Sequence, residues 1–178
     1  RQAAALLAAD IVHAGREDQI AYRGSARFVA RLRPAPAPRA PEPLRIRPDA
    51  TYLVTGGTGG MGLEVARWLG EQGARHLVLT GRTGAARFPE AVARSLEALG
   101  ARVIVRAADS ASETNMREVF EEIGASMPPL AGVIHIAGIF DDRVLTGHDW
   151  HRFDAVLAPK VRGGWILHEL TREMALDF

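Results

Sequence analysis

The chain has 178 residues, of which 47% are hydrophobic and 24% are charged, so it is long enough for one globular domain with a sizeable core. The formal net charge is only +1 and the arginines are spread along the chain, which argues against a nucleic-acid-binding surface. The lack of cysteine excludes disulfides and thiolate metal sites, and it agrees with a cytoplasmic location.

The ends of the chain give no sign of membrane targeting. No apolar run is long enough to cross a bilayer, and Asp10 interrupts the apolar run near the N-terminus, so neither a membrane span nor a signal peptide is expected. Arg1 is not an initiator Met, and residues 175–178 look like the start of a strand. We therefore expect the sequence to be a piece of a longer chain.

The first third of the chain predicts a small helix and hairpin followed by a linker. Residues 1–12 are rich in Ala and Leu and favour a short helix that ends by Gly15. Residues 19–23 and 27–32 alternate apolar and polar side chains, which is typical of a β-hairpin. Prolines recur from residue 34 to 48 and favour extended chain, either as a linker or as a strap packed on the main domain.

A glycine-rich turn within residues 52–62, YLVTGGTGGMG, is the strongest local signal. An apolar run precedes the turn and an amphipathic segment follows it, so the pattern predicts strand, tight turn and helix. Gly56, Gly60 and Gly62 would let backbone N–H groups at the helix N-terminus approach a pyrophosphate. The alternative is a glycine-rich loop without a ligand.

Strands and helices are expected to alternate along the rest of the chain. This order predicts an α/β fold with a doubly wound parallel sheet, in which ligands bind at the carboxyl ends of the strands. Ser112 is a plausible helix cap, and Pro159 predicts a break or restart between the last two helices. The expected strands are 76–80, 102–105 and 130–136, and the expected helices are 88–99, 112–123, 148–157 and 161–174.

Residues just after the predicted strands are therefore candidates for ligand contacts. Arg82 stands where an arginine would hold the 2′-phosphate of NADPH, although it could also be a solvated surface residue. Asp109 could accept a hydrogen bond from an adenine amino group or cap the next helix. The small Ala137–Gly138 pair would let the chain pass close to a ribose or nicotinamide, with Asp141 and Asp142 at the rim.

Three histidines, His148, His151 and His168, do not form a metal-binding pattern. No cluster of carboxylates or thiols completes a ligand set around them. We expect no metal.

Five motifs in this order and spacing resemble the ketoreductase domain of a modular type I polyketide synthase, a member of the short-chain dehydrogenase/reductase superfamily. They are TGGTGGMG, HLVLTGR, AADSAS, LAGVIHIAGIFDDRVL and VLAPKVRGGWILHEL, and the resemblance runs from about Tyr52 to the last residue. The segment EDQIAYRGSARFVARL resembles the end of the structural subdomain that precedes the catalytic one. The resemblance implies a structural subdomain at 1–33, a linker at 34–48 and the cofactor-binding part of the catalytic subdomain at 49–178.

The resemblance also implies an activity, namely NADPH-dependent reduction of a β-ketoacyl thioester to a β-hydroxyacyl thioester. The acyl chain would be carried by the phosphopantetheine of an acyl carrier protein, beside other synthase domains in the same chain. A serine would polarise the ketone and a tyrosine would supply the proton. Both would lie past Phe178, so the fold is expected to be incomplete at its C-terminus and this piece alone is expected to reduce nothing.

Site residues follow from the resemblance by position. Lys160 matches the lysine of the catalytic tetrad, which in this family lies upstream of the serine. Phe140, Asp141 and Asp142 resemble the Leu-Asp-Asp loop of B-type ketoreductases, with Phe in place of Leu, and imply control of product stereochemistry. The residues implied for cofactor binding are Thr55, Gly56, Thr58, Gly59, Gly60, Met61, Gly62, Arg82, Asp109, Ser110, Ala137 and Gly138.

Two other functions fit parts of the sequence. A non-reducing structural or docking domain could keep the nucleotide-binding fold, although Arg82 and Lys160 count against it. A stand-alone short-chain dehydrogenase is the second alternative, but such an enzyme usually begins near its first strand and lacks the N-terminal hairpin.

Overall fold

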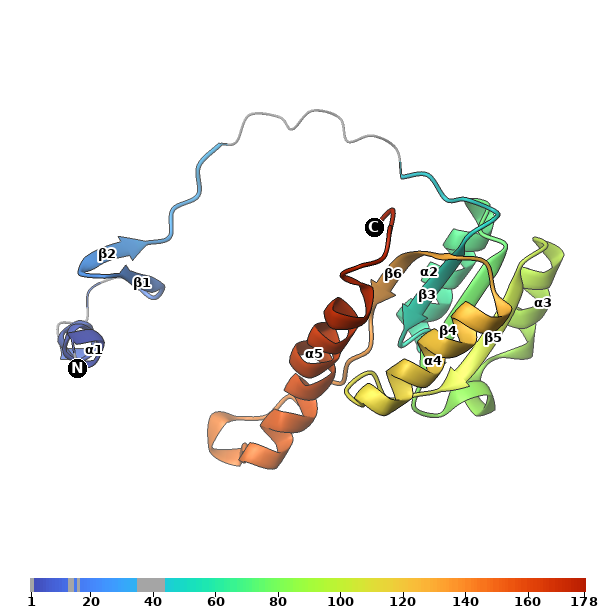
Figure 1. Cartoon of the computed structure of the whole chain (residues 1–178). Helices are drawn as coiled ribbons and strands as arrows, with labels where there is room; N and C mark the ends of the chain where they lie inside the picture. The colour runs from blue at the N-terminus through green and yellow to red at the C-terminus, as the bar shows by residue number, and fades with distance from the viewer. Residues whose placement is uncertain (1, 13–14, 16, 35–43) are drawn as a thin grey trace. The chain divides into compact units, whose positions relative to one another are not determined.

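The computed structural model describes residues 2–12, 15, 17–34 and 44–178 and divides the chain into two units, Arg1–Pro43 and Leu44–Phe178 (Figure 1). The first unit contains the predicted helix and hairpin, α1 (Gln2–Val12), β1 (Ile20–Arg23) and β2 (Ala26–Val29). Their antiparallel pairing ends at Arg23 and Ala26, and Gly24 turns the chain with a φ of +63°.

Asp10 ties the helix of the first unit to its hairpin. Its carboxylate accepts a hydrogen bond from the Tyr22 hydroxyl and one from Arg27 Nε at 2.9 Å. The hydrogen bonds from Tyr22 and Arg27 hold the pKa of Asp10 below its ordinary value. A short hairpin that is weak by itself is thus held against the preceding helix.

The second unit is a three-layer α/β fold with a parallel sheet, as the sequence predicted (Figure 1). The strand order is β5-β4-β3-β6. The two neighbours of β3 are therefore β4, the next strand in the sequence, and β6, which comes much later in the sequence. The strands are β3 (Thr51–Thr55), β4 (His76–Gly81), β5 (Arg102–Ala107) and β6 (Leu130–His135). The helices are α2 (Gly60–Glu71), α3 (Glu90–Ala98), α4 (Glu113–Ser126) and α5 (Trp150–Thr171), with 3₁₀ turns η1 (Gly84–Arg87) and η2 (Leu145–Gly147).

The two faces of the sheet belong to different core clusters. Tyr52 and Val54 of β3 pack with α2 and α3, whereas Leu53 points to the opposite face and packs with α4 and α5. All three side chains are 0% exposed. Burial on both faces explains why these strands are continuous apolar runs rather than alternating ones.

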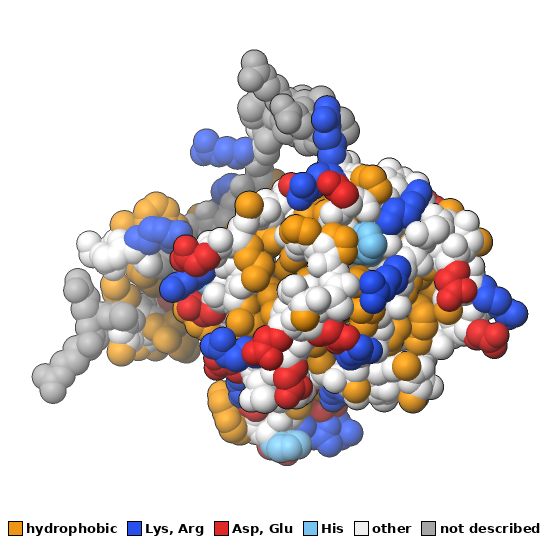
Figure 2. Space-filling model, turned by 45° about the vertical axis from the view of Figure 1, so that its right-hand side comes forward, with side chains coloured by type: hydrophobic (Ala, Val, Ile, Leu, Met, Phe, Trp, Pro, Cys, Tyr) orange, Lys and Arg blue, Asp and Glu red, His pale blue; other side chains and the backbone are white. Residues whose placement is uncertain are grey.

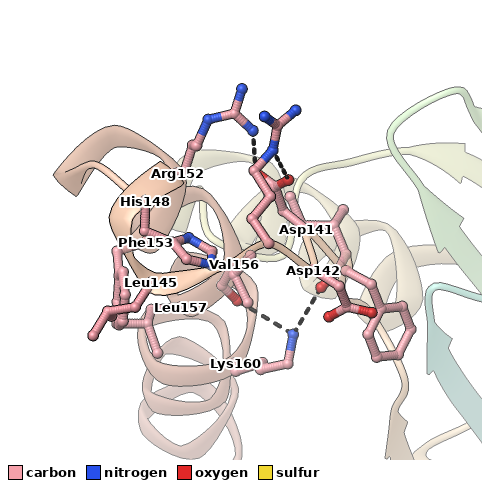
Figure 3. A pocket seen from close by; sticks show the side chains of 12 residues that line it. Asp141, Asp142, Leu145, His148, Arg152, Phe153, Val156, Leu157 and Lys160 are labelled. Carbon is pink, nitrogen blue, oxygen red and sulfur yellow. Dashed lines mark hydrogen bonds and ion pairs between the residues drawn. The ribbon is translucent and has the colours of Figure 1, made fainter.

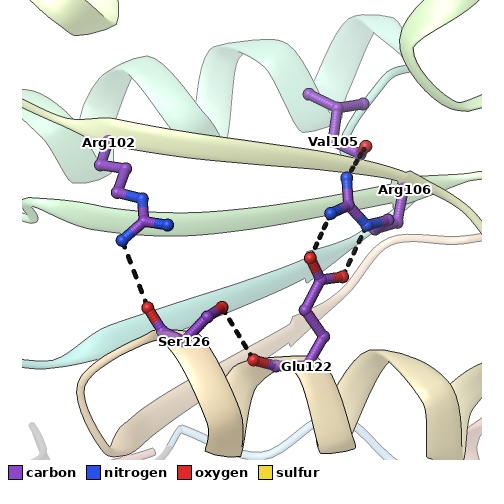
Figure 4. A network of polar contacts seen from close by, with 5 residues as sticks. All are labelled: Arg102, Val105, Arg106, Glu122 and Ser126. Carbon is purple, nitrogen blue, oxygen red and sulfur yellow. Dashed lines mark hydrogen bonds and ion pairs between the residues drawn. The ribbon is translucent and has the colours of Figure 1, made fainter.

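Polar contacts join the edge strand β5 to α4 (Figure 4). Arg106 pairs with Glu122 through two of its guanidinium nitrogens, one of them Nε at 2.5 Å, and Arg102 donates to the Ser126 carbonyl at 3.2 Å. The edge strand is therefore attached to the helix that covers it at two points along its length.

Several element boundaries differ from the predictions by a few residues. α3 begins at Glu90 rather than residue 88, because the backbone of Phe88 and Pro89 is extended, as expected for Phe88, which precedes a proline. The break predicted at Pro159 is wrong, since α5 runs without interruption from Trp150 to Thr171 with this proline inside it. The predicted cap is confirmed, because the Ser112 hydroxyl accepts a hydrogen bond from the Asn115 N–H at 3.3 Å.

The last part of the predicted proline-rich linker can be compared with the structure. Residues 35–43 of the predicted linker lie outside the described residues, while residues 44–48 belong to the second unit. Ile46 packs against the core, and Arg47 donates its N–H to Tyr52 Oη at 2.6 Å and its guanidinium to Asp177 at 2.8 Å. Residues 44–48 are therefore packed on the second unit, as the strap interpretation predicted, and are not a free linker.

The surface carries charges of both signs. Figure 2 shows acidic and basic side chains interspersed over the face in view, in keeping with the small net charge. Among the described residues, no helix combines the length and apolar character that crossing a bilayer requires.

We predict that the central sheet dominates the stability of the second unit. Leu79 of β4 is 0% exposed, so Leu79→Ala should lower the free energy of unfolding by about 2–5 kcal/mol through lost burial and a residual cavity. Urea denaturation followed by circular dichroism measures this change. Leu145→Ala, at a side chain 82% exposed, is the matched control and should alter stability by no more than about 0.5 kcal/mol.

Candidate functional site

The glycine turn between β3 and α2 is packed too tightly for side chains at Gly56, Gly57 and Gly62. Gly56 has a φ of +69°, and a Cβ there would lie 2.8 Å from the Ala137 nitrogen. A Cβ on Gly62 would lie 2.3 Å from the Gly56 carbonyl oxygen. The turn is thus pressed against itself and against the segment that follows β6.

The start of α2 presents free backbone donors on the open side of this turn. Gly59 is the N-cap and provides no side-chain hydrogen bond, and the first helical bond runs from the Leu63 N–H to the Gly59 carbonyl. The N–H groups of residues 60–62 therefore have no intrahelical acceptor. A Cβ at Gly60 would meet nothing within 4 Å. Unpaired donors, a clear approach and the helix dipole together fit a pyrophosphate.

A cleft of about 630 Å³ opens beside this turn at the carboxyl ends of the strands. It brings together most of the residues predicted to bind cofactor, drawn from the segments that follow β3, β4, β5 and β6. The predicted cofactor residues that line it are Gly56, Thr58, Gly59, Gly60, Met61, Gly62, Arg82, Asp109, Ser110, Ala137 and Gly138, and Phe140, predicted for stereocontrol, lines it as well.

Arg82 is the basic side chain of this cleft. It lies directly after β4, is exposed, and makes no hydrogen bond or ion pair with the described part of the chain. A guanidinium without a partner retains its donors for an anionic ligand, and phosphate is a preferred one.

Asp109 and Ser110 line the cleft after β5. The Asp109 carboxylate accepts the Ala111 N–H at 2.9 Å through Oδ1, so Oδ2 is left to face a ligand. The alternative that Asp109 caps the next helix is wrong, because Ser112 occupies the cap of α4. Ser110 is buried against α5, where a Cβ on Gly163 would lie 3.1 Å from its Oγ.

Thr55 is the one predicted cofactor residue that does not line this cleft. Its side chain is 0% exposed, and its hydroxyl lies 2.6 Å from His135 Nδ1 and 3.4 Å from the Ala137 N–H. The other ring nitrogen of His135, Nε2, lies 2.8 Å from the Pro159 carbonyl oxygen of α5. Thr55 thus lies beneath the cleft and connects its walls.

A second pocket, of about 450 Å³, lies between α5 and the segment after β6 (Figure 3). Asp141, Asp142 and Lys160, which the sequence predicted as site residues, line it with Phe140. Phe140 and Ile139 also line the first cleft, so the two pockets adjoin.

The two neighbouring carboxylates of this pocket differ in their contacts. Asp141 accepts from Arg152 of α5 at 2.5 Å and from Arg143 at 3.4 Å. The hydrogen bond from Arg152, reinforced by its charge and by Arg143, holds the pKa of Asp141 below its ordinary value. Asp142 is exposed and forms no hydrogen bond or ion pair with the described residues, so its carboxylate is free to face a ligand.

Lys160 projects from α5 into the second pocket, toward the segment after β6 (Figure 3). Its ammonium donates to the Ile139 carbonyl at 3.2 Å and to the Val156 carbonyl at 3.3 Å, and it lies 5.7 Å from the centre of the Phe140 ring. A Cβ on Gly138 would lie 3.3 Å from Nζ, so the glycine gives the ammonium room.

Several residues that line the first cleft were not predicted. Those at the carboxyl ends of β4, β5 and β6, or just after them, follow the rule that ligands bind at the carboxyl ends of strands, which could have identified them. Those from α5 carry no local signal, because their position depends on how the helix packs. The unpredicted residues are Thr80, Gly81, Thr83, Ala108, Ala111, Ile136, Ile139, Ala155, Ala158 and Pro159. Among the described residues, no group of three His, Cys, Asp or Glu is arranged to hold a metal ion.

The parallel sheet, the glycine turn and the cleft at the strand ends define a Rossmann-like domain of the short-chain dehydrogenase/reductase type. A family model described as the KR domain matches residues 50–178. The chain belongs to this family, the ketoreductase domains of polyketide synthases.

Similar proteins support this assignment. The 5-methyl-1-naphthoate synthase of Streptomyces sahachiroi is 38% identical over 177 residues, which is 91% of this chain and 10% of that protein. A phenolphthiocerol/phthiocerol polyketide synthase protein of Mycobacterium tuberculosis is 36% identical over 176 residues, covering 97% of this chain and 10% of the relative. The chain therefore spans about a tenth of the length of these synthases.

Solved ketoreductase structures share the fold of this chain. A structure described as an A1-type ketoreductase has a TM-score of 0.78 and 41% identity, and the match covers 98% of this chain and 37% of that one. A second, described among A-type ketoreductases from a modular polyketide synthase, has a TM-score of 0.74 and 40% identity, covering 99% and 38%.

We predict that Arg152 sets the ionisation of Asp141. Arg152→Gln removes the main hydrogen bond to this carboxylate, so the pKa of Asp141 should rise toward its ordinary value. Because the pKa is lowered in the folded chain, the ion pair is complete above the ordinary Asp value and is lost as pH falls through the lowered one. Carbon-13 NMR of the side-chain carboxyl follows this titration.

A matched control comes from the same helix. Arg162→Gln removes an exposed arginine that contacts Asp154 at 3.4 Å, and it should leave the titration of Asp141 unchanged. An Asp141 pKa that stays low in Arg152→Gln would show that another group holds the loop.

Proposed function

We propose that this chain forms the NADPH-binding part of a ketoreductase that reduces a β-ketoacyl thioester to a β-hydroxyacyl thioester during polyketide biosynthesis. The observation that carries the proposal is the pair of adjoining pockets, one with a glycine cradle and a free arginine, the other with Lys160 and a free carboxylate. One pocket suits a phosphorylated dinucleotide and the other suits an acyl substrate beside it.

Each wall of the first cleft has a distinct task in this proposal. The backbone N–H groups at the start of α2 would hold the pyrophosphate, and Arg82 would hold the 2′-phosphate. Asp109 would accept from the adenine amino group through Oδ2, since Oδ1 is already bonded. NADPH, when bound, supplies the hydride for the reduction.

Lys160 is the catalytic residue that we propose within this chain. Its ammonium lies where the two pockets meet, and a positive charge there favours the ionised form of a nearby acid. The family resemblance implies that this acid is a tyrosine beyond Phe178, accompanied by a serine. A phenol that releases its proton more readily protonates the developing alkoxide more effectively.

We also propose that the loop after β6 controls the stereochemistry and gives a B-type product. Support comes from Phe140, Asp141 and Asp142, which match the Leu-Asp-Asp pattern of that class except for the Phe. Two solved relatives at 41% and 40% identity are described as A1-type and A-type, so the loop and the overall similarity point to different classes. We give weight to the loop because it lines the pocket beside Lys160.

The first unit fits the end of a ketoreductase structural subdomain. The similarity to the mycobacterial synthase covers 97% of this chain, so the relative shares residues of this unit as well. The partners that we propose are an acyl carrier protein with its phosphopantetheine-bound substrate and other domains of the same synthase.

Arg82 tests the cofactor assignment. In an active ketoreductase that contains this chain, Arg82→Ala should weaken NADPH binding at least about tenfold, because charge-assisted contacts to the 2′-phosphate are lost, and should change NADH binding by less than about threefold. Fluorescence titration with both cofactors measures the difference. Arg117→Ala, at an exposed arginine that pairs with Glu113 on α4, is the control and should alter neither. An equal loss for both cofactors in Arg82→Ala would remove the 2′-phosphate role.

Asp142 tests the stereochemical assignment. Asp142→Asn keeps the size of the side chain and removes its charge, so the ratio of the two product alcohols should fall by about tenfold if this carboxylate helps to orient the substrate. Chiral chromatography of the reduced thioester measures the ratio. Glu97→Gln removes an exposed charge on α3, which lines neither pocket, and should leave the ratio unchanged. A product of unaltered configuration and purity from Asp142→Asn would argue against the loop assignment.

A further inference from the structure

His135 makes a hydrogen bond at each end of its ring, and the two bonds join different layers of the fold. Nδ1 lies 2.6 Å from Thr55 Oγ1 at the end of β3, and Nε2 lies 2.8 Å from the Pro159 carbonyl oxygen in α5. A carbonyl oxygen only accepts, so Nε2 must carry the hydrogen, and in the neutral ring Nδ1 accepts from the Thr55 hydroxyl. The Thr55 oxygen in turn faces the Ala137 N–H at 3.4 Å.

The bond to Pro159 reaches α5 where the helix is intrinsically weak. Proline has no N–H, so the carbonyl of Ala155 has no donor one turn later, and an internal proline usually kinks or breaks a helix. Yet α5 continues from Trp150 to Thr171. The His135 bond attaches the proline residue itself to β6 and so restrains the turn that lacks its own hydrogen bond.

Lys160 is the next residue after the restrained proline. Its ammonium lies between the Ile139 carbonyl, which belongs to the segment after β6, and the Val156 carbonyl of its own helix. A tilt of α5 at the proline would therefore move the ammonium relative to the junction of the two pockets. A displacement of about 1 Å in a catalytic group can lower the rate about a hundredfold.

We propose that His135 is a positioning residue for Lys160, acting by holding the Pro159 turn of α5 against β6. The proposal rests on the proposed function, because it concerns the place of the lysine that acts in the reaction. His135 itself lines neither pocket, and its effect passes through the backbone of α5.

Two substitutions separate the two ends of the ring. The amide of His135→Gln reaches as far as Nε2 and can still donate to the Pro159 carbonyl, while that of His135→Asn reaches only to Nδ1 and loses this bond. In an active ketoreductase that contains this chain, His135→Asn should lower kcat about tenfold, and His135→Gln should restore it to within about threefold of the parent. Equal losses in the two variants would overturn the proposal.

A double-mutant cycle links the effect to the lysine. Lys160→Ala should lower kcat by itself, and adding His135→Asn to it should then lower kcat by less than about twofold, because there is no ammonium left to misplace. If the two losses multiply, His135 acts by another route and the proposal fails. If Lys160→Ala leaves kcat unchanged, the role of Lys160 in the proposed function fails instead.

Two measurements on the cofactor-free chain do not depend on activity. Amide hydrogen exchange across residues 155–163 should be at least about threefold faster in His135→Asn than in His135→Gln, since only the former releases the proline turn. Nitrogen-15 NMR of the unsubstituted chain should show hydrogen on Nε2 of His135. A ring that carries its hydrogen on Nδ1 alone would contradict the bond to Pro159, whether or not the variants fold.

Discussion

The close approach of the glycine turn to the strand ends is the constraint on which the site depends. A Cβ at Gly57 would lie 2.8 Å from the Val54 carbonyl and one at Gly81 would lie 2.1 Å from Thr58 Oγ1, so the turn lies directly on the ends of β3 and β4. The same closeness brings Gly56 against Ala137 after β6. Because three strands end against one backbone turn, the start of α2 and the residues after each strand share a single cleft.

Charge is divided within the pocket beside that cleft. Two aspartates adjacent in sequence have different surroundings, since Asp141 is held by two arginines while Asp142 has no hydrogen bond or ion pair among the described residues. Both oxygens of Asp141 already accept a hydrogen bond from an arginine, so this carboxylate is less available to a ligand than that of Asp142. The arginine from α5 therefore fixes the loop and leaves its neighbour available.

Local signals sufficed for the sheet and for most of the cleft. Apolar runs bounded by glycine predicted the strands, and Gly56 to Gly62 predicted the turn. Both predictions rest on steric requirements that involve only a few neighbouring residues. The predicted helix break or restart at Pro159 was wrong because this region depends on a contact that is distant in the sequence. His135, which lies 24 residues earlier, contacts that proline, and no pattern near residue 159 reports it. Thr55 likewise matched a motif position. Its burial and its contact with His135, 80 residues away, depend on the assembled sheet and could not be predicted from local sequence.

The strand order also has a consequence for how the domain forms. β3 pairs with β4, which follows it closely, but its other neighbour is β6, and the Thr55–His135 contact between them spans 80 residues. Closing a longer loop costs more chain entropy, so pairing of β3 with β4 and of β4 with β5 is favoured to come first. Since the residues after β6 line both pockets, neither pocket has its full set of walls until this last strand has docked. Ligand binding is accordingly a property of the sheet with β6 in place and not of the part that forms earlier.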